Sequence, residues 1–189
     1  MRALPPSFYR RDPREVAPEL LNKVLAGADG RSGRIVEVEA YCGEHDPAAH
    51  TFRGKTARNA SMFGPAGHMY VYFTYGMHWC ANVVCGEVGE GVGVLLRALE
   101  PLDGLPLMRQ ARAKAKTDRD LCRGPARLTQ AMGISGTDDG ADLGTGRFRV
   151  VDDGVPPPVN PMAGPRIGIS RAIEEPWRWH VPGNRYVSR

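Results

Sequence analysis

Two glutamates and a tyrosine carry the spacing in this sequence that most directly suggests chemistry. The stretch RIVEVEAY, residues 34–41, places Glu37, Glu39 and Tyr41 at alternate positions with small apolar residues between them. Alternation with a period of two predicts a strand whose second face carries both carboxylates. A carboxylate in a cleft can accept a proton from water, and burial and neighbouring charges set its protonation state. The stretch therefore offers a candidate general base.

A solvated strand face with two surface glutamates is the simpler interpretation of Glu37 and Glu39, and the strand alone favours it. If one of the two is catalytic, Glu39 is the better placed. It lies two residues from Tyr41 and leads into a long irregular segment, residues 42–67, of the kind that is often functional.

Aromatic rings in the following segments could form a pocket for a nucleobase. Tyr41, His50 and Tyr72 offer faces on which a base could stack, an interaction worth about 1–3 kcal/mol per base. The alternative for Tyr41 and Tyr72 is that they are ordinary strand aromatics in the core. Tyr75 is expected at the tip of a hairpin, where a bulky side chain could enter between base steps as the apolar wedges of minor-groove binders do.

One arginine and two histidines have other possible roles. Arg97 is the single charge in the apolar stretch VGVLLRAL, so it either contacts a phosphate or base or belongs to a buried ion pair. His45 and His50 lie beside acidic residues, but their spacing of five matches no defensible metal-ligand pattern. We therefore expect no metal and no cofactor.

The elements that must position these residues predict a mixed α/β (α+β) fold, a single compact domain over residues 1–189. We expect a curved, largely antiparallel sheet with packed helices and a protruding β-hairpin. Helices are expected at 13–24, 105–116 and 125–133, and strands at 34–41, 92–99, 147–151, 166–170 and 178–181, with the hairpin at 69–84 turning near 74–77.

Composition is typical of a globular chain, with 42% apolar and 24% charged residues and a net charge of +4. That charge is only a weak pointer to nucleic acid. No apolar run approaches the roughly 20 residues of a membrane span, and residues 1–22 lack a secretory signal. The four cysteines form no CxxC pair and are expected to be packed thiols. We expect a monomer in the cytoplasm, associated with the nucleoid if the source is bacterial, and no membrane partner.

Several longer segments together resemble one family, the alkyladenine (3-methyladenine) DNA glycosylases of the mammalian type, or methylpurine DNA glycosylases. Besides RIVEVEAY, they are DPAAH at 46–50, ARNASMF at 57–63, MYVYFTYGMHWCANV at 69–83, VLLRALEPLDG at 94–104 and LCRGPARLTQAMGI at 121–134. The pieces RIGIS and YVS near the end of the sequence are also similar to the family. The resemblance covers nearly the whole chain from about Leu4, in the order of the family's segments.

The resemblance implies a monofunctional enzyme that hydrolyses the N-glycosidic bond of alkylated or deaminated purines in duplex DNA. Its substrates would be of the 3-methyladenine, 7-methylguanine, hypoxanthine and ethenoadenine class, reached by base flipping, and its product would enter base excision repair. The family's fold is a mixed α/β domain with a hairpin that enters the minor groove. The family needs no metal or organic cofactor.

Site residues follow from the same resemblance, carried onto matching positions. Glu39 is implied as the general base that deprotonates the water attacking C1′, and Arg97 as the residue holding the flipped nucleotide near that water. The other implied roles are base-pocket walls at Tyr41, His50 and Tyr72, exclusion of the guanine amine at Asn82, intercalation at Tyr75, and DNA contacts at Met77, Arg58 and Asn59.

Other classes of function stay open on the residues alone. One is a non-catalytic binder of damaged or distorted nucleic acid with the same fold. Another is a hydrolase of a small nucleoside, which would need no wedge at Tyr75. A metal-dependent hydrolase is the third, and activity in EDTA would exclude it.

Overall fold

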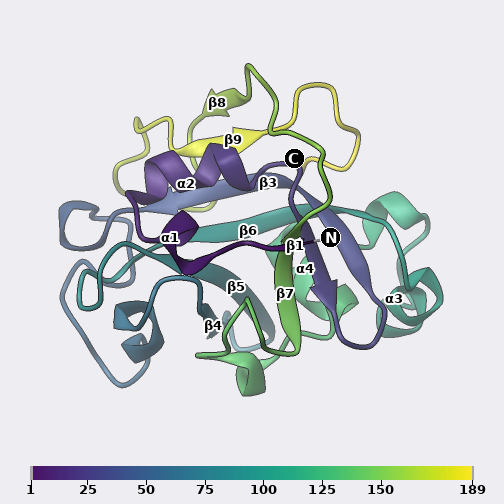
Figure 1. Cartoon of the computed structure of the whole chain (residues 1–189), viewed down its shortest axis with the longest axis horizontal. Helices are drawn as coiled ribbons and strands as arrows, with labels where there is room; N and C mark the ends of the chain where they lie inside the picture. Colours follow the sequence, from purple (N-terminus) through teal and green to yellow (C-terminus); the bar gives the residue numbers. More distant parts are fainter. Residues whose placement is uncertain (1, 189) are drawn as a thin grey trace.

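A curled sheet carries the fold, with short helices packed against it (Figure 1). The computed structural model describes residues 2–188. The strands are β1 Arg2–Ala3, β2 Val24–Gly27, β3 Ser32–Tyr41, β4 Met69–Thr74, β5 His78–Cys85, β6 Val92–Pro101, β7 Phe148–Asp152, β8 Met162–Gly164 and β9 Arg178–His180. The helices are α1 Pro6–Tyr9, α2 Pro13–Leu20, α3 Leu105–Ala111 and α4 Pro125–Met132, with short 3-10 turns η1 Gly43–His45, η2 Ala60–Phe63, η3 Asp118–Asp120 and η4 Gly136–Asp138.

The strands run in the order β1-β7-β2-β3-β6-β5-β4, and β9 pairs with both β3 and β8. All of these pairings are antiparallel. The predicted fold class is therefore confirmed: a mixed α/β structure with a curved antiparallel sheet, packed helices and a β-hairpin. Among residues 2–188, no helix is both long and apolar enough to cross a bilayer.

Helix boundaries follow local sequence signals where those signals are strong. Asp12 caps α2 by accepting a hydrogen bond from the backbone N–H of Arg14 at 2.8 Å, and Pro13 occupies the first helical position. Helix α4 likewise begins with Pro125 and ends at Gly133, whose φ of 71° is the left-handed conformation that favours glycine. Both beginnings, and the end of α4, were predicted from the sequence.

Three predicted elements differ in the structure. The helix expected to reach Val24 ends at Leu20, because Asn22 adopts a left-handed φ of 68° and Val24 begins β2. The helix expected over 105–116 ends at Ala111. Residues 166–170 form no strand, and the side chain of Arg166 instead holds this segment against the rest of the protein. The short strands β1, β2 and β8 were not predicted.

The apolar core lies between the sheet and the helices. Helix α2 packs against β3, and α4 packs against β5 and β6 (Figure 1). The largest fully buried side chains include Leu20, Ile35, Leu96 and Leu99. Removal of such apolar surface from water is the main favourable contribution to folding. The core therefore fixes β3 and β6, the two strands that carry the charged residues described below.

Strand β3 is a central strand, and both of its edges are paired. It pairs with β6 on one side and with β2 and then β9 on the other. Glu37 and Glu39 have no exposed surface, so the interpretation of these residues as a solvated strand face is wrong. The reason is that the segments on either side of β9, which contribute Ile167 and Ser188, contact the two carboxylates on the polar side of β3.

A hairpin formed by β4 and β5 is present, as predicted, and its tip consists of residues 75–77. Thr74 pairs with His78, and Tyr75 and Gly76 adopt left-handed φ values of 50° and 66°. Tyr75 is 81% exposed and Met77 is 67% exposed. Large apolar side chains at an exposed tip are uncommon unless they meet a partner.

Candidate active site

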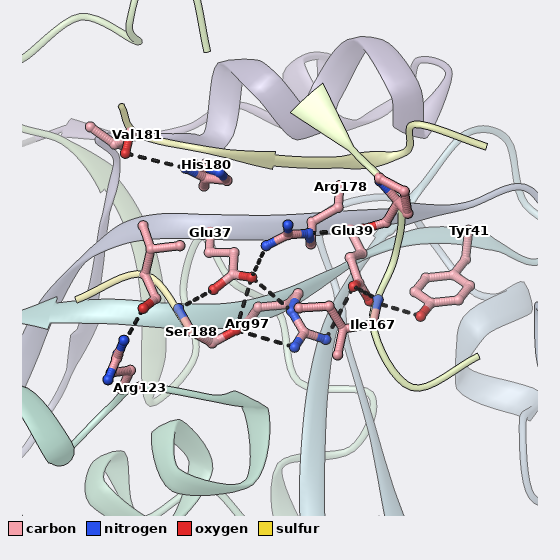
Figure 2. A network of polar contacts seen from close by, with 12 residues as sticks. Glu37, Glu39, Tyr41, Arg97, Arg123, Ile167, Arg178, His180, Val181 and Ser188 are labelled. Atoms are coloured by element: carbon pink, nitrogen blue, oxygen red, sulfur yellow. Dashed lines mark hydrogen bonds and ion pairs between the residues drawn. The ribbon is translucent and has the colours of Figure 1, made fainter. Parts of the chain in front are cut away.

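A buried arginine lies between the two glutamates of β3 (Figure 2). The Arg97 Nε is 3.1 Å from Oε1 of Glu37, and its Nη1 is 3.1 Å from Oε1 of Glu39. The register of β3 against β6 shifts here, because Glu37 lies opposite Ala98 and Val38 lies opposite Leu96. Such an irregularity can redirect a side chain. Of the two roles considered for Arg97, the buried ion pair is the one that the structure contains.

Glu37 is surrounded by protein donors and is held as an anion. Arg178 Nη1 and the Ser188 hydroxyl donate to its Oε1, each at 2.9 Å, and the Ser188 backbone N–H donates to its Oε2 at 2.6 Å. Burial alone would raise the pKa of Glu37, but Arg97, Ser188 and Arg178 together hold this pKa below its ordinary value. Four protein donors bind the Glu37 carboxylate, three at Oε1 and one at Oε2. Two of the residues that supply them, Arg178 and Ser188, do not line the cavity described below.

Glu39 is bound differently and keeps one position open. Its Oε1 accepts the backbone N–H of Ile167 at 2.7 Å and pairs with Arg97, while its Oε2 accepts the Tyr41 hydroxyl at 2.9 Å. No other donor in the described part of the chain reaches it, so one of about four acceptor positions remains for water. Burial raises the pKa of Glu39 above its ordinary value, although Arg97, Ile167 and Tyr41 act in the opposite direction. A raised pKa suits a group that must accept a proton near neutral pH.

A cavity of about 490 Å³ adjoins Glu39. Three residues that contact the Glu39 carboxylate, namely Tyr41, Arg97 and Ile167, also line this cavity. Its volume falls within the range of small-molecule sites, which is about 300–1,000 Å³. The carboxylate thus lies directly behind the cavity wall.

Aromatic rings form much of that wall. His50 lies edge-on to Tyr72 with ring centroids 4.4 Å apart, and Tyr70 stacks on Tyr72 at 5.4 Å. The Tyr70 hydroxyl is 3.2 Å from Nδ1 of His50, which holds the imidazole in place. Partial burial lowers the pKa of His50, and nearby Arg58 lowers it further, so this ring is neutral at neutral pH. Tyr41, His50 and Tyr72, predicted as base-pocket walls, all line the same cavity.

Asn82 of β5 lines the cavity from a buried position. Its Nδ2 donates to the backbone carbonyl of Tyr70 at 3.2 Å, which fixes the amide across the β4–β5 pair. Met62, Tyr70 and Val84 form a small apolar cluster on which Tyr41 and Tyr72 pack. The polar amide is therefore presented from a rigid, apolar support.

The residues predicted to contact DNA lie at different depths. Tyr75 is exposed and also lines the cavity, so the hairpin tip stands at its mouth. Exposed Arg58 supports the hairpin by donating from Nη2 to the carbonyl of Phe73 at 2.7 Å. Asn59 is buried, and its amide donates to the carbonyls of His50 at 3.0 Å and Gly54 at 3.1 Å. We expect the Asn59 side chain to hold this loop rather than to contact DNA.

Several site residues escaped residue-by-residue prediction because their partners are remote in sequence. Ile167 reaches Glu39 across 128 residues, and Ser188 reaches Glu37 across 151. Their segments carry no chemical motif of their own, and the resemblance of RIGIS and YVS to a known family was the one available signal. Arg166 and Arg178 were missed for the same reason. Tyr70 and Asp46 lie in segments that resemble the family, but they were assigned no role.

An acidic residue beside His45 and His50 is bound by an arginine, and the cysteines are packed in the core. Asp46 forms a buried ion pair with Arg166, with oxygen–nitrogen distances of 2.5 and 2.8 Å. All four cysteines are free and buried, as expected for packed thiols. Over residues 2–188, no group of three or more His, Cys, Asp or Glu side chains is arranged to hold a metal ion.

Comparison with known proteins gives one consistent result. The model of the family described as methylpurine-DNA glycosylase (MPG) matches residues 7–185. A protein of Burkholderia cenocepacia (strain HI2424), named as a 3-methyladenine DNA glycosylase, is 67% identical over 187 residues, or 98% of this chain and 90% of the relative. Relatives with the same name are 50% identical in Rhodopseudomonas palustris (strain BisB18), over 97% of this chain and 89% of theirs, and 49% identical in Methanoculleus marisnigri, over 98% of both chains.

Proposed function

Because this chain belongs to the methylpurine-DNA glycosylase family and is therefore a DNA glycosylase, we propose that it removes alkylated or deaminated purines from duplex DNA. Its substrates are of the 3-methyladenine, 7-methylguanine, hypoxanthine and ethenoadenine class. The observation that carries this proposal is the open acceptor position of Glu39 beside a cavity walled by aromatic rings.

The damaged base reaches the cavity by flipping. A base stacked inside a duplex is inaccessible to a buried carboxylate, and a damaged or mispaired base costs least to unstack. Tyr41, His50 and Tyr72 line the cavity and offer it faces for stacking. Asn82 lines the same cavity, where its bulk would exclude the exocyclic amine of an undamaged guanine.

Hydrolysis follows from the charges around Glu39. Cleavage of the N-glycosidic bond develops positive charge on the sugar, which an anionic carboxylate stabilises. Glu39 orients a water through its open acceptor position and takes the proton as this water attacks C1′. Arg97 stabilises the ionised form of Glu39, and it also lines the cavity, where it can hold the flipped nucleotide. The product would be an abasic site in the DNA, which base excision repair then processes.

Replacement of Tyr75 by alanine tests the proposed wedge at the hairpin tip. We expect Tyr75→Ala to bind lesion-containing duplex about tenfold more weakly, because the side chain that fills the space of the flipped nucleotide is gone. Single-stranded lesion DNA needs no such filling, so its binding should change little. Val159→Ala, at another exposed apolar residue (94% exposed), is the matched control. Equal losses on duplex and single strands in a binding titration would contradict the wedge.

The proposed activity is tested by release of free base from a duplex oligonucleotide that contains one hypoxanthine, with EDTA present. We expect free hypoxanthine and an abasic site, with no strand cleavage by the enzyme itself. Duplexes with 3-methyladenine and ethenoadenine are tested in parallel. Tight binding to all three without base release would indicate a non-catalytic binder. Activity on free nucleosides that exceeds activity on duplex DNA would indicate a nucleoside hydrolase.

A further inference from the structure

Arg166 is a buried cation that lies behind one wall of the cavity. Its Nη1 and Nη2 bond to the two oxygens of Asp46 at 2.5 and 2.8 Å, and Nη1 also donates to the carbonyl of Ala40 at 2.9 Å. Neither side chain of this ion pair is exposed. Because bidentate pairing fixes the plane of a guanidinium as well as its position, Arg166 is rigidly placed.

The guanidinium of Arg166 lies over two aromatic rings. Its central carbon is 4.7 Å from the ring centroid of Tyr41 and 5.0 Å from that of Trp177. Tyr41 lines the cavity whereas Arg166 does not, so Arg166 supports the Tyr41 ring from the protein side. Cation–π contacts of this kind are stronger where water is excluded.

The same ion pair joins the two loops at the rim of the cavity. On one side, Asp46 accepts the backbone N–H groups of Cys42 at 3.2 Å and Ala48 at 3.0 Å, and Ala48 lines the cavity. On the other side, the segment that follows Arg166, residues 167–171, also lines it. The backbone N–H of Ile167, directly after Arg166, donates to Glu39. One side chain thus anchors both loops and the peptide that binds Glu39.

We propose that Arg166 is a positioning residue that sets the Tyr41 ring against the flipped base and the Ile167 N–H against Glu39. This inference rests on the proposed function, in which Glu39 is the general base and the cavity holds the base. It assigns Arg166 two separable effects, one on lesion binding through Tyr41 and one on the pH dependence of base release through Glu39.

The second effect depends on every group that faces Glu39. Arg97 from β6 and Arg166 bring positive charge, and Glu37 on β3 brings negative charge, itself paired with Arg178 of β9. The neutral groups are the Tyr41 hydroxyl, the Cys80 thiol of β5 and the Ile167 N–H. Loss of the Ile167 hydrogen bond would disfavour the anion and raise the pKa of Glu39. Base release requires ionised Glu39, so its rate increases with pH as Glu39 loses its proton. This part of the pH–rate profile, the acidic limb, would then move to higher pH.

The test is Arg166→Lys, which keeps a positive charge beside Asp46 but removes the planar, bidentate contact. We expect the acidic limb of the pH–rate profile for single-turnover base release to shift to higher pH by about one unit. Binding of lesion duplex should weaken about fivefold as Tyr41 loses its support. Both are measured on the hypoxanthine duplex, with thermal unfolding recorded alongside.

Arg34→Lys is the matched control. Arg34 makes the same pattern of bonds away from the cavity, two to Asp153 at 3.2 and 2.7 Å and one to the carbonyl of Asn22 at 2.7 Å. The Arg34→Lys variant should have a lower unfolding temperature, but its acidic limb and its affinity for lesion duplex should be unchanged. If Arg166→Lys behaves like this control, the inference is overturned. If it does not fold, Asp46→Asn is judged by the same criteria.

Glu39→Gln, measured in parallel, separates failure of the inference from failure of the proposed function. An inactive Glu39→Gln together with an unshifted Arg166→Lys overturns the inference and leaves the proposed function standing. Turnover retained by Glu39→Gln overturns the role of Glu39, and with it the proposed function and the inference.

Discussion

The Glu39→Gln variant is expected to bind lesion-containing duplex nearly as well as the unchanged protein and to release base at least about 100-fold more slowly, the scale of a lost general base. Glutamine has the size of glutamate, and its amide oxygen can still accept from Ile167 and Arg97. Its NH2 group can donate to the Tyr41 hydroxyl. The pocket should therefore keep its shape while losing the proton acceptor. Single-turnover base release and a binding titration measure the two quantities separately.

Glu44→Gln is the control for removal of a carboxylate near the site, since Glu44 lies in the neighbouring loop with its side chain 78% exposed. It should leave both binding and base release unchanged. Base release by Glu39→Gln at the rate of the unchanged protein would assign the proton acceptor to another group. A parallel loss of lesion binding and base release would instead show that Glu39 shapes the pocket.

Arg97→Met is expected to destabilise the protein by about 3–5 kcal/mol, the scale measured when one partner of a buried ion pair is removed. Arg97 separates two carboxylates with no exposed surface, and methionine would leave both without their shared counter-charge. Arg178 and Ser188 would still bind Glu37, so Glu39 bears most of the change. Urea unfolding at neutral pH measures the loss of stability. Base release should also become slower, because removal of Arg97 raises the pKa of Glu39 further and leaves a smaller fraction of Glu39 ionised.

The pH dependence of this deficit checks its cause. A carboxyl group whose folded-state pKa is raised costs stability at pH values above that pKa. The cost disappears below the unfolded-state pKa, where the group is protonated in both states. The deficit of Arg97→Met should therefore shrink as pH is lowered towards about 4, near the ordinary glutamate pKa. Arg109→Met removes a surface partner of Asp118, with side chains 56% and 36% exposed, and should cost far less stability than Arg97→Met because exposed ion pairs contribute little. A pH-independent deficit at Arg97 would point to lost packing instead.

Sequence patterns predicted the fold where the determinant is local. The period-two stretch around Glu37 and Glu39, the hairpin that turns at Tyr75 and the helix from Pro125 to Gly133 each depend on neighbouring residues, and each is present. The helix expected to reach Val24 was wrong because Leu20, Leu21 and Val24 have helical spacing, yet the chain leaves the helix at Leu20 and Val24 begins a strand. Local propensity does not decide such short segments.

The site itself could be predicted only in part. Alternation placed Glu37 and Glu39 on one face of a strand, but whether that face meets water depends on segments more than a hundred residues away. Residues 166–170 were predicted as a strand from their composition, yet Arg166 uses its side chain, not a backbone ladder, to fix the segment. Charge pairing between remote positions leaves no periodic trace in one sequence. The different partners of Glu37 and Glu39 are visible only in the folded structure.

The contact between Glu37 and Ser188 also bears on the order in which the protein is assembled. The two residues are 151 positions apart, and Arg178 meets Glu37 across 141. Contacts of such long range carry a large loop-closure cost and form late unless earlier structure has brought their ends together. Strands β3 and β6 can pair, and Arg97 can meet Glu37, before residues 178–188 arrive. A newly made chain would thus pair β3 with β6 first, and would acquire β9 and the final charge balance of its site last.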